Sequence, residues 1–333
     1  MGDFLSTPNK TKDSSDGENT YLKFGASAMQ GWRYRMEDTH ITSLNNLNNK
    51  FDIFGVFDGH GGKEVSQFVK KHFVEEFLKN TNTKRDNIKQ SLIETFLQMD
   101  KLLVTKEGEK ELKELAIISK KEDEIQDKKN KKKSDDWMKK LDPKESLDCD
   151  IAMITGCTAC VCVIDHNNKK IYFANAGDSR SVLCKNGKAY QTSFDHKPDL
   201  SYEKNRVYKA KGWVSEGRIN GNLNLSRSLG DLEYKQFKEG SEKQQMITAF
   251  PDVNIENLDE NCDFIVIGCD GIWDCLTPQE ACDYVINNVK KNNKISKTVE
   301  NLMDSILAKD KMNELGIGCD NMSCIVIQFK KNW

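Results

Sequence analysis

The sequence predicts an α+β fold, because apolar runs typical of strands are mixed with long amphipathic segments. Short runs rich in Val, Ile and Phe, such as 51–57 and 264–269, have the length and composition of fully buried strands. Residues 62–80 and about 86–104 instead carry apolar side chains at helical spacing. Strands and helices follow one another without strict alternation, which favours α+β layers.

The N-terminal part of the chain begins with a polar segment. Residues 1–20 contain few apolar side chains, and we expect them to be flexible. Strands are predicted at 21–28 and 51–57, and the segment 41–50 between them, with its Asn pairs, is typical of a hairpin loop. After the two helices, residues 105–148 become highly charged, so an exposed helix or a disordered insert is expected there.

The second half of the chain contains the remaining strands and helices. Strands are predicted at 158–164, 171–176, 180–184, 248–254, 263–269 and 323–329. Helices are predicted at 199–211, about 278–292 and 296–309. Asn186-Gly187 favours a tight hairpin turn, while Asp199 and Thr277 are predicted to cap the first two helices. The Gly-rich, polar segment 212–245 is typical of a loop-rich flap.

Three Asp residues stand where predicted strands meet loops. Asp58 and Asp270 each follow an apolar run, and Asp320 shortly precedes one. A carboxylate at the rim of a sheet is half desolvated, which is costly unless it is paired or binds a cation. Each Asp alone could instead cap a helix or begin a turn. Taken together with the acidic pair described next, the three favour a shared site for a hard metal ion.

An acidic pair and an arginine lie upstream of the first of these residues. Glu37 and Asp38 add two carboxylates, and Arg33 adds a cation that can bind a phosphate through two parallel hydrogen bonds. Carboxylates for metal ions, combined with an arginine for an anion, are what hydrolysis of a phosphate ester requires.

These residues belong to a series of motifs that closely resembles the metal-dependent protein serine/threonine phosphatases of the 2C type (the PPM family). The matching segments are Gly31-Trp32-Arg33 with Met36-Glu37-Asp38, Asp58-Gly59-His60-Gly61-Gly62, Gly156-Cys157-Thr158-Ala159, Ala176-Gly177-Asp178-Ser179-Arg180, Asp195-His196-Lys197-Pro198, Ser226-Arg227-Ser228-Leu229-Gly230-Asp231, Cys269-Asp270-Gly271-Ile272-Trp273-Asp274 and Asp320-Asn321-Met322-Ser323. They occur in the family's order. The resemblance implies two antiparallel β-sheets packed as a central sandwich and flanked by α-helices, in four layers (αββα).

The resemblance also implies a centre of two divalent metal ions. The implied ligands are Asp58, the backbone carbonyl of Gly59, Asp270, Asp320, Glu37 and Asp38. Asp58 would bridge the two ions, and Glu37 and Asp38 would act through bound waters or directly. All-oxygen ligands select Mg²⁺ or Mn²⁺. Two such ions can turn a shared water into hydroxide for in-line attack at phosphorus, so the implied function is hydrolysis of phosphoserine and phosphothreonine in proteins.

The same resemblance implies two catalytic residues. Arg33 is expected to orient the phosphoryl group. His60 directly follows the ligand pair Asp58-Gly59 and is the candidate general acid for the departing Ser or Thr oxygen. Asp178 and Asp231 also match the family and are interpreted as structural or flap-supporting residues.

One position departs from the family pattern. Many members have an Asp three residues before the Gly matched by Gly156, where it binds a weaker third metal ion; here that position is Met153, whose thioether is unsuited to Mg²⁺. Either the loop shifts to deliver the nearby Asp150, or the third ion binds poorly. The alternative function is therefore a pseudophosphatase that binds phosphoproteins with weak turnover. A metal-dependent nuclease is disfavoured, since no basic face with interleaved aromatic residues is evident.

Length, charge and cysteine content restrict the remaining possibilities. A chain of 333 residues suggests about two domains, but candidate ligands from Glu37 to Asp320 require one catalytic domain over 21–330. The formal net charge of −2 gives no global attraction to nucleic acid, and none is expected as a partner. The eleven cysteines lack zinc-site spacing and are interpreted as small core residues in a reducing compartment. We expect a monomer.

Two segments give indications about location in the cell. Met1 to Ser6 fits the N-myristoylation pattern, with Gly2 exposed after removal of Met1. One myristoyl chain binds membranes only marginally, and the basic block Lys128–Lys133 can supply a second signal at a membrane surface. The charge pattern itself favours a solvated spacer, and a nuclear-import signal is an alternative to the membrane signal. We expect a cytoplasmic protein, with membrane association and nuclear import left open; no secretory segment or bilayer-spanning stretch is evident.

Overall fold

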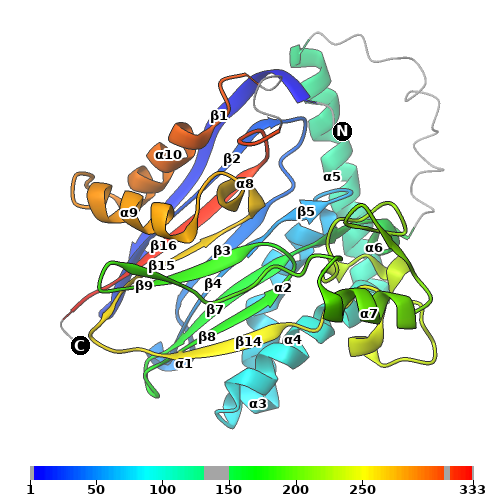
Figure 1. Cartoon of the computed structure of the whole chain (residues 1–333), viewed down its shortest axis with the longest axis horizontal. Helices are drawn as coiled ribbons and strands as arrows, with labels where there is room; N and C mark the ends of the chain where they lie inside the picture. Colours follow the sequence, from blue (N-terminus) through cyan, green and yellow to red (C-terminus); the bar gives the residue numbers. More distant parts are fainter. Residues whose placement is uncertain (1–3, 131–149, 311–315, 332–333) are drawn as a thin grey trace.

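Two antiparallel sheets lie face to face, with helices on both outer sides (Figure 1). The computed structural model describes residues 4–130, 150–310 and 316–331, and the side chains of 126–130 are not described. Helices α9 (Pro278–Asn288) and α10 (Ile295–Ile306) cover one sheet, and α2 (Glu64–Lys79) and α4 (Ile88–Leu103) cover the other. The predicted α+β sandwich with four layers is therefore confirmed.

The two sheets have six and five strands. The first has the order β1 (Phe4–Glu18), β2 (Leu22–Arg33), β16 (Met322–Phe329), β15 (Cys262–Gly268), β9 (Arg180–Lys185) and β10 (Lys188–Gln191). The second has the order β14 (Asp252–Asn257), β8 (Lys170–Ala176), β7 (Ala159–Asp165), β4 (Phe51–Phe57) and β3 (Thr39–Asn45). The β9–β10 hairpin turns at Asn186-Gly187, where both residues have positive φ, as the dipeptide predicts.

Strand β4 shows why the predicted strands read as continuous apolar runs. Its residues Phe54 and Val56 belong to the core between the two sheets, whereas Ile53 and Phe57 belong to the core beneath the helices. Successive side chains of a strand point to opposite faces, so a strand covered on both faces must be apolar at nearly every position. Asp58 therefore directly follows a strand whose residues are all buried.

The prediction of a flexible N-terminus is wrong for those of its residues that the structure describes. Residues 4–18 form β1, which pairs with β2 along its length, and Leu5 is buried. The backbone pairing of an edge strand depends little on side-chain polarity. Polar contacts also attach this strand, since the Asp16 carboxylate accepts hydrogen bonds from the backbone and side chain of Ser296 in α10. Residues 1–3, with the acylation motif's Gly2, lie outside the described residues.

Three further expectations need correction. The segment 41–50 is not a single loop, because β3 extends to Asn45 and only a short turn of helix, α1 (Asn46–Asn49), separates it from β4. Asp199 does not cap α7 (Ser201–Lys209), which is preceded by Leu200 and has no side-chain cap. Strand β14 begins four residues later than predicted, because the backbone at Thr248 pairs with the flap at Ser228 and Arg227 instead.

Most predicted helices are confirmed within a few residues. Thr277 caps α9 in a reciprocal hydrogen-bonded pair with Glu280, and Pro278 occupies its first turn. The N-terminal part of the charged insert is a helix, α5 (Lys106–Asn130), which packs against α2 and α4. Residues 131–133 of the basic block 128–133 lie outside the described residues. No helix in the described part of the chain combines the length and apolar character needed to cross a bilayer.

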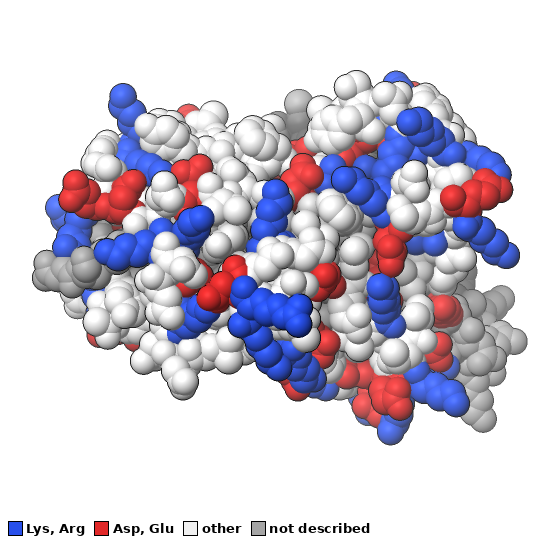
Figure 2. Space-filling view, turned by 90° about the horizontal axis from the view of Figure 1, so that it is seen from below, with Lys and Arg blue, Asp and Glu red and all other residues white. Residues whose placement is uncertain are grey.

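Several short elements complete the fold. They are the helices α3 (Thr81–Lys84), α6 (Ile151–Ile154) and α8 (Asp270–Trp273), and the two-residue strands β5 (Gly59–His60), β6 (Gly156–Cys157), β11 (Val214–Ser215), β12 (Arg218–Ile219) and β13 (Leu229–Gly230). Strands β13, β6 and β5 form a small separate sheet, in that order. On the face seen in Figure 2, Lys and Arg are interspersed with Asp and Glu.

Candidate metal centre

The ends of four strands bring the candidate ligands together. Strands β2 and β15 end, and β16 begins, at the same edge of the six-stranded sheet, as their register shows. The loops beyond this edge pack closely: a Cβ on Gly271 would lie 2.0 Å from the backbone oxygen of Asn321. Only glycine permits that approach, which draws Asp270 toward Asp320. Asp58, at the end of β4, comes from the opposite sheet.

Asn321 fixes the loop that carries the acidic pair. Its side-chain amide donates to the backbone oxygens of Gln30 (2.8 Å) and Arg35 (2.9 Å), and its carbonyl accepts from the backbone N–H of Glu37 (2.9 Å). The side chain is buried, so these bonds are shielded from water. In the sequence, Asn321 was identified only as part of a motif, with no role of its own.

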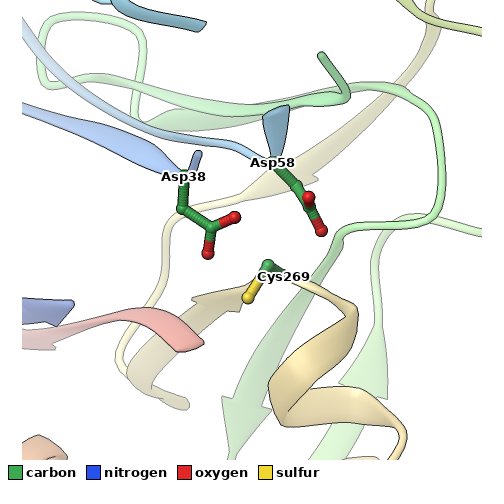
Figure 3. A group of neighbouring side chains, drawn as sticks. All are labelled: Asp38, Asp58 and Cys269. Atoms are coloured by element: carbon green, nitrogen blue, oxygen red, sulfur yellow. The ribbon is translucent and has the colours of Figure 1, made fainter. Parts of the chain in front are cut away.

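The side chains of Asp38 and Asp58 lie close together beside Cys269 (Figure 3), with Asp38 buried and Asp58 half-buried. Together with Cys269 they offer three potential ligand atoms within 4.8 Å of one another. Oδ2 of Asp38 is buried and has no hydrogen-bond partner among the described residues. An unpartnered carboxylate oxygen in such a place is costly unless a cation is bound there.

The carboxylates of this cluster also repel one another. Burial, followed by the charges of Asp38, Asp270 and Asp320, raises the pKa of Asp58 well above its ordinary value. Burial and the charge of Asp320 raise the pKa of Asp38 to about 7. The pKa of Asp270 is likewise raised, first by burial and then by the neighbouring charges of Asp178 and Asp320. Acids that are partly or fully withdrawn from water and destabilise each other's charge in this way fit a site for divalent cations.

Cys269 is an unpredicted neighbour of the two carboxylates. Burial and the adjacent acids raise the pKa of its thiol well above the usual value, so it remains neutral. Its sulfur accepts a hydrogen bond from the backbone N–H of Ser323, and its thiol donates to the backbone oxygen of Asn321. These bonds join β15 to β16, so the residue supports the geometry of the site.

Glu37 and Gly59 lie on the side of the cluster nearest to His60. A Cβ on Gly59 would lie 2.4 Å from the backbone oxygen of Glu37, so the two segments touch. Burial raises the pKa of Glu37, while the positive charges of Arg35 and His60 oppose this shift. The structure thus brings all six predicted ligands to one end of the sandwich.

Arg33 occurs in a different arrangement from the one predicted. Instead of standing free for an anion, its Nη2 donates to Oδ2 of Asp320 at 2.5 Å. Burial lowers the pKa of the guanidinium, but the charge and hydrogen bond of Asp320, together with other nearby carboxylates, outweigh it, so the net shift is upward. Its Cζ also lies 6.0 Å from the centre of the Phe4 ring in β1. The side chain remains 42% exposed, so part of its donor set faces solvent.

His60 has a partner that the sequence did not reveal. Its Nε2 lies 2.7 Å from Oδ2 of Asp231, which follows β13 in the flap. Burial alone would lower the pKa of His60, but the charge and hydrogen bond of Asp231, together with other nearby acids, raise it overall. The interpretation of Asp231 as structural or flap-supporting therefore omits its most direct contact with a site residue.

Asp178 and Asp150 differ in their relation to the cluster. Asp178 is buried, forms an ion pair with Lys197 and contributes to the raised pKa of Asp270. Asp150 is exposed at the start of α6, and the Met153 sulfur lies 4.0 Å from the amide of Gln236. Replacement of the missing third ligand by Asp150 stays a prediction.

Comparison with known proteins gives the same family along nearly the whole chain. The family model described as "Protein phosphatase 2C" matches residues 22–114 and 100–315. The chain is 41% identical over 349 residues to "Probable protein phosphatase 2C 21" of Arabidopsis thaliana, covering 99% of this chain and 93% of that protein. It is 45% identical over 335 residues to "Probable protein phosphatase 2C 3" of Paramecium tetraurelia, covering 99% and 100%.

Solved structures agree with this assignment at the level of the fold. A phosphatase from Toxoplasma gondii superposes with a TM-score of 0.70 at 19% identity, covering 97% of this chain and 96% of that one. A serine-threonine phosphatase 2C from the same organism superposes with a TM-score of 0.68 at 17% identity, covering 96% and 99%. The resemblance inferred from the motifs is confirmed: the chain belongs to the protein phosphatase 2C family of metal-dependent protein serine/threonine phosphatases.

Proposed function

We propose that this chain hydrolyses phosphoserine and phosphothreonine in proteins with the help of two Mg²⁺ or Mn²⁺ ions. The observation that carries the proposal is the close approach of buried Asp38 and half-buried Asp58, whose carboxylates repel each other and include an oxygen without a hydrogen-bond partner among the described residues. Oxygen donors of this kind suit hard divalent cations.

Six residues would hold the ions. They are Asp58 as the bridging ligand, Gly59 through its backbone carbonyl, Asp270, Asp320, Glu37 and Asp38. When bound, such ions lower the pKa of water and offset the negative charge of a phosphoryl group. Glycine at position 59 lets the backbone of Glu37 approach closely, because a Cβ there would lie 2.4 Å from the Glu37 backbone oxygen.

Arg33 would orient the phosphoryl group. Its guanidinium has several N–H donors, and the bond to Asp320 uses only one nitrogen. The exposed remainder can donate to phosphoryl oxygens while Asp320 holds the side chain in place. The bond to Asp320 would thus keep the anion-binding group beside the carboxylates.

His60 would donate a proton to the departing Ser or Thr oxygen as the P–O bond breaks. Asp231 occupies Nε2, which leaves Nδ1 as the ring nitrogen for the leaving group. An alkyl oxygen is a poor leaving group unless it is protonated, and general acids typically contribute about 10²–10⁴-fold to such steps.

Metal-dependent turnover of a phosphothreonine peptide tests the proposal. The chelator-treated protein should be inactive and should regain activity with Mn²⁺ or Mg²⁺. Asp58→Asn should lower the restored rate by at least about 10³-fold, since it removes the bridging charge. Asp283→Asn, on the exposed face of α9, is the matched control and should keep the wild-type rate. Restored activity in Asp58→Asn would contradict the proposal.

The alternative function, a phosphoprotein-binding pseudophosphatase, rests on Met153 at the third-ligand position. It predicts metal binding and phosphopeptide binding without appreciable turnover at any Mn²⁺ concentration. The same titration therefore separates the two functions.

We also propose N-myristoylation of Gly2, on the evidence of the N-terminal sequence pattern alone. The acyl chain and the basic block Lys128–Lys133 would act together at an anionic membrane surface. Acylated protein should sediment with phosphatidylserine vesicles, and Gly2→Ala should not. Equal sedimentation of both proteins would eliminate the lipid anchor and leave a cytoplasmic or nuclear location.

A further inference from the structure

We infer that Asp231 is a positioning residue, which orients the His60 imidazole toward the leaving group. The inference rests on the proposed function, because it assigns His60 the proton donation described there. It also goes beyond a purely flap-supporting role, since it connects the flap to the reaction through one hydrogen bond.

The small sheet β13–β6–β5 places the two residues together. Gly156 in the middle strand is paired with Gly230 on one side and with His60 on the other. Asp231 directly follows Gly230, so the flap delivers its carboxylate across the middle strand to the imidazole. The resulting separation between Oδ2 and Nε2 is 2.7 Å, which is a strong hydrogen-bond distance.

Gly156 leaves the space that this contact needs. A Cβ at position 156 would lie 2.2 Å from Oδ2 of Asp231 and 2.5 Å from its Cγ. Because the obstruction is the carboxylate itself, any side chain at this position would displace Asp231 from His60. The absence of a side chain at Gly156 in the middle strand therefore allows the contact between Asp231 and His60.

Asp231 is itself held rigidly. Its backbone N–H donates to the oxygen of Thr155 (2.9 Å), and the hydroxyl of Ser228 donates to its Oδ2 (2.5 Å). The side chain is buried, whereas that of His60 is 24% exposed. A fixed carboxylate on Nε2 determines the plane of the ring and directs Nδ1 toward the accessible side.

Asp100 in α4 provides a comparison within the same flap. Its carboxylate accepts from the backbone N–H of Gly230 (2.9 Å) and from Lys235 (2.5 Å). It therefore supports the flap directly before Asp231 but does not contact His60. Substitution of Asp100 should therefore show the effect of a loosened flap without a direct change at His60.

Leaving-group dependence distinguishes positioning from support. An aryl phosphate leaves without much protonation, whereas a phosphothreonine peptide needs a proton, so a misdirected His60 should impair only the second. Asp231→Asn should lower kcat for the peptide by about 10–100-fold and for the aryl phosphate by less than about threefold. Gly156→Ala, which keeps the acid but displaces it, should show the same selectivity.

Two controls make the result decisive. In the His60→Gln background, Asp231→Asn should cause no further selective loss, because both act through one proton transfer. Asp100→Asn should lower the melting temperature and affect both substrates equally. Equal losses on both substrates for Asp231→Asn, or additive losses with His60→Gln, would overturn the inference. If the wild-type protein hydrolysed neither substrate with Mn²⁺, the proposed function itself would fail.

Discussion

Arg33 and Asp320 form an ion pair at 2.5 Å, so the predicted anion-binding residue is bonded to a predicted metal ligand. Arg33 is the last residue of β2, and Asp320 lies just before β16, the neighbouring strand of the six-stranded sheet. If Asp320 binds a metal ion as proposed, that ion and the guanidinium would compete for the same carboxylate, and both would attract a phosphoryl group.

Because of this competition, removal of the Arg33 guanidinium should have opposite effects on metal binding and on substrate binding. Arg33→Ala should tighten Mn²⁺ binding, because a neighbouring positive charge is removed, and should raise KM for the phosphopeptide about tenfold or more, since a charge-assisted contact is lost. Calorimetric titration and steady-state kinetics measure the two quantities. The exposed residue Arg85 provides the control variant, Arg85→Ala. Weaker Mn²⁺ binding in Arg33→Ala would contradict the competition.

Asn321 should matter for stability as well as for the site. Asn321→Ala leaves two backbone oxygens and one N–H without their present partners, and we expect a loss of about 3 kcal/mol in the free energy of unfolding. Urea unfolding at saturating Mn²⁺ provides the value. The exposed Asn254→Ala should change stability by less than about 0.5 kcal/mol. A similarly small effect at Asn321 would mean that another group holds the 30–37 loop.

The N-terminal strand gives a direct test of the corrected prediction. A flexible tail would tolerate any substitution, whereas Leu5 is buried in the structure. Leu5→Ala should therefore cost about 2–3 kcal/mol, while the exposed neighbour Thr7→Ala should cost little. Denaturant midpoints compare the two variants, and indistinguishable midpoints would restore the flexible tail.

His40 should make the fold sensitive to acid. Burial, assisted by the charge of Lys70 and opposed by Asp13, lowers the pKa of His40 to about 4 from an ordinary 6.5. The unfolded chain then binds more protons than the folded protein between these values, so stability falls as pH decreases from about 6.5 to 4. Over this pH range the protonation of His40 should lower the free energy of unfolding by about 3 kcal/mol in total. His40→Gln should show a flatter stability profile in this range, and an unchanged slope would assign the sensitivity elsewhere.

The sequence predicted those parts of the molecule that depend on local pattern. Strands such as β4 are covered on both faces, so burial alone makes them apolar, and the carboxylates that follow them stand out. Strand β1 was missed because an edge strand with polar side chains carries no such pattern. The pairing of His60 with Asp231 could not be predicted, since 171 positions separate them and the sheet that joins them has two-residue strands.

Asn321 shows a second limit. A polar residue inside a motif can contact a ligand, cap a turn or bind a backbone, and composition does not distinguish these roles. Only the fold reveals that the side-chain amide of Asn321 donates hydrogen bonds to the backbone oxygens of Gln30 and Arg35.

The central claim is that Asp38 and Asp58, with the neighbouring acids, form a binding site for divalent cations. Calorimetric titration of Mn²⁺ into the chelator-treated protein tests it most directly. We predict two bound ions per chain for the wild-type protein and loss of at least one of them in Asp58→Asn, with both proteins folded. Failure of the wild-type protein to bind Mn²⁺, or undiminished binding by Asp58→Asn, would contradict the claim.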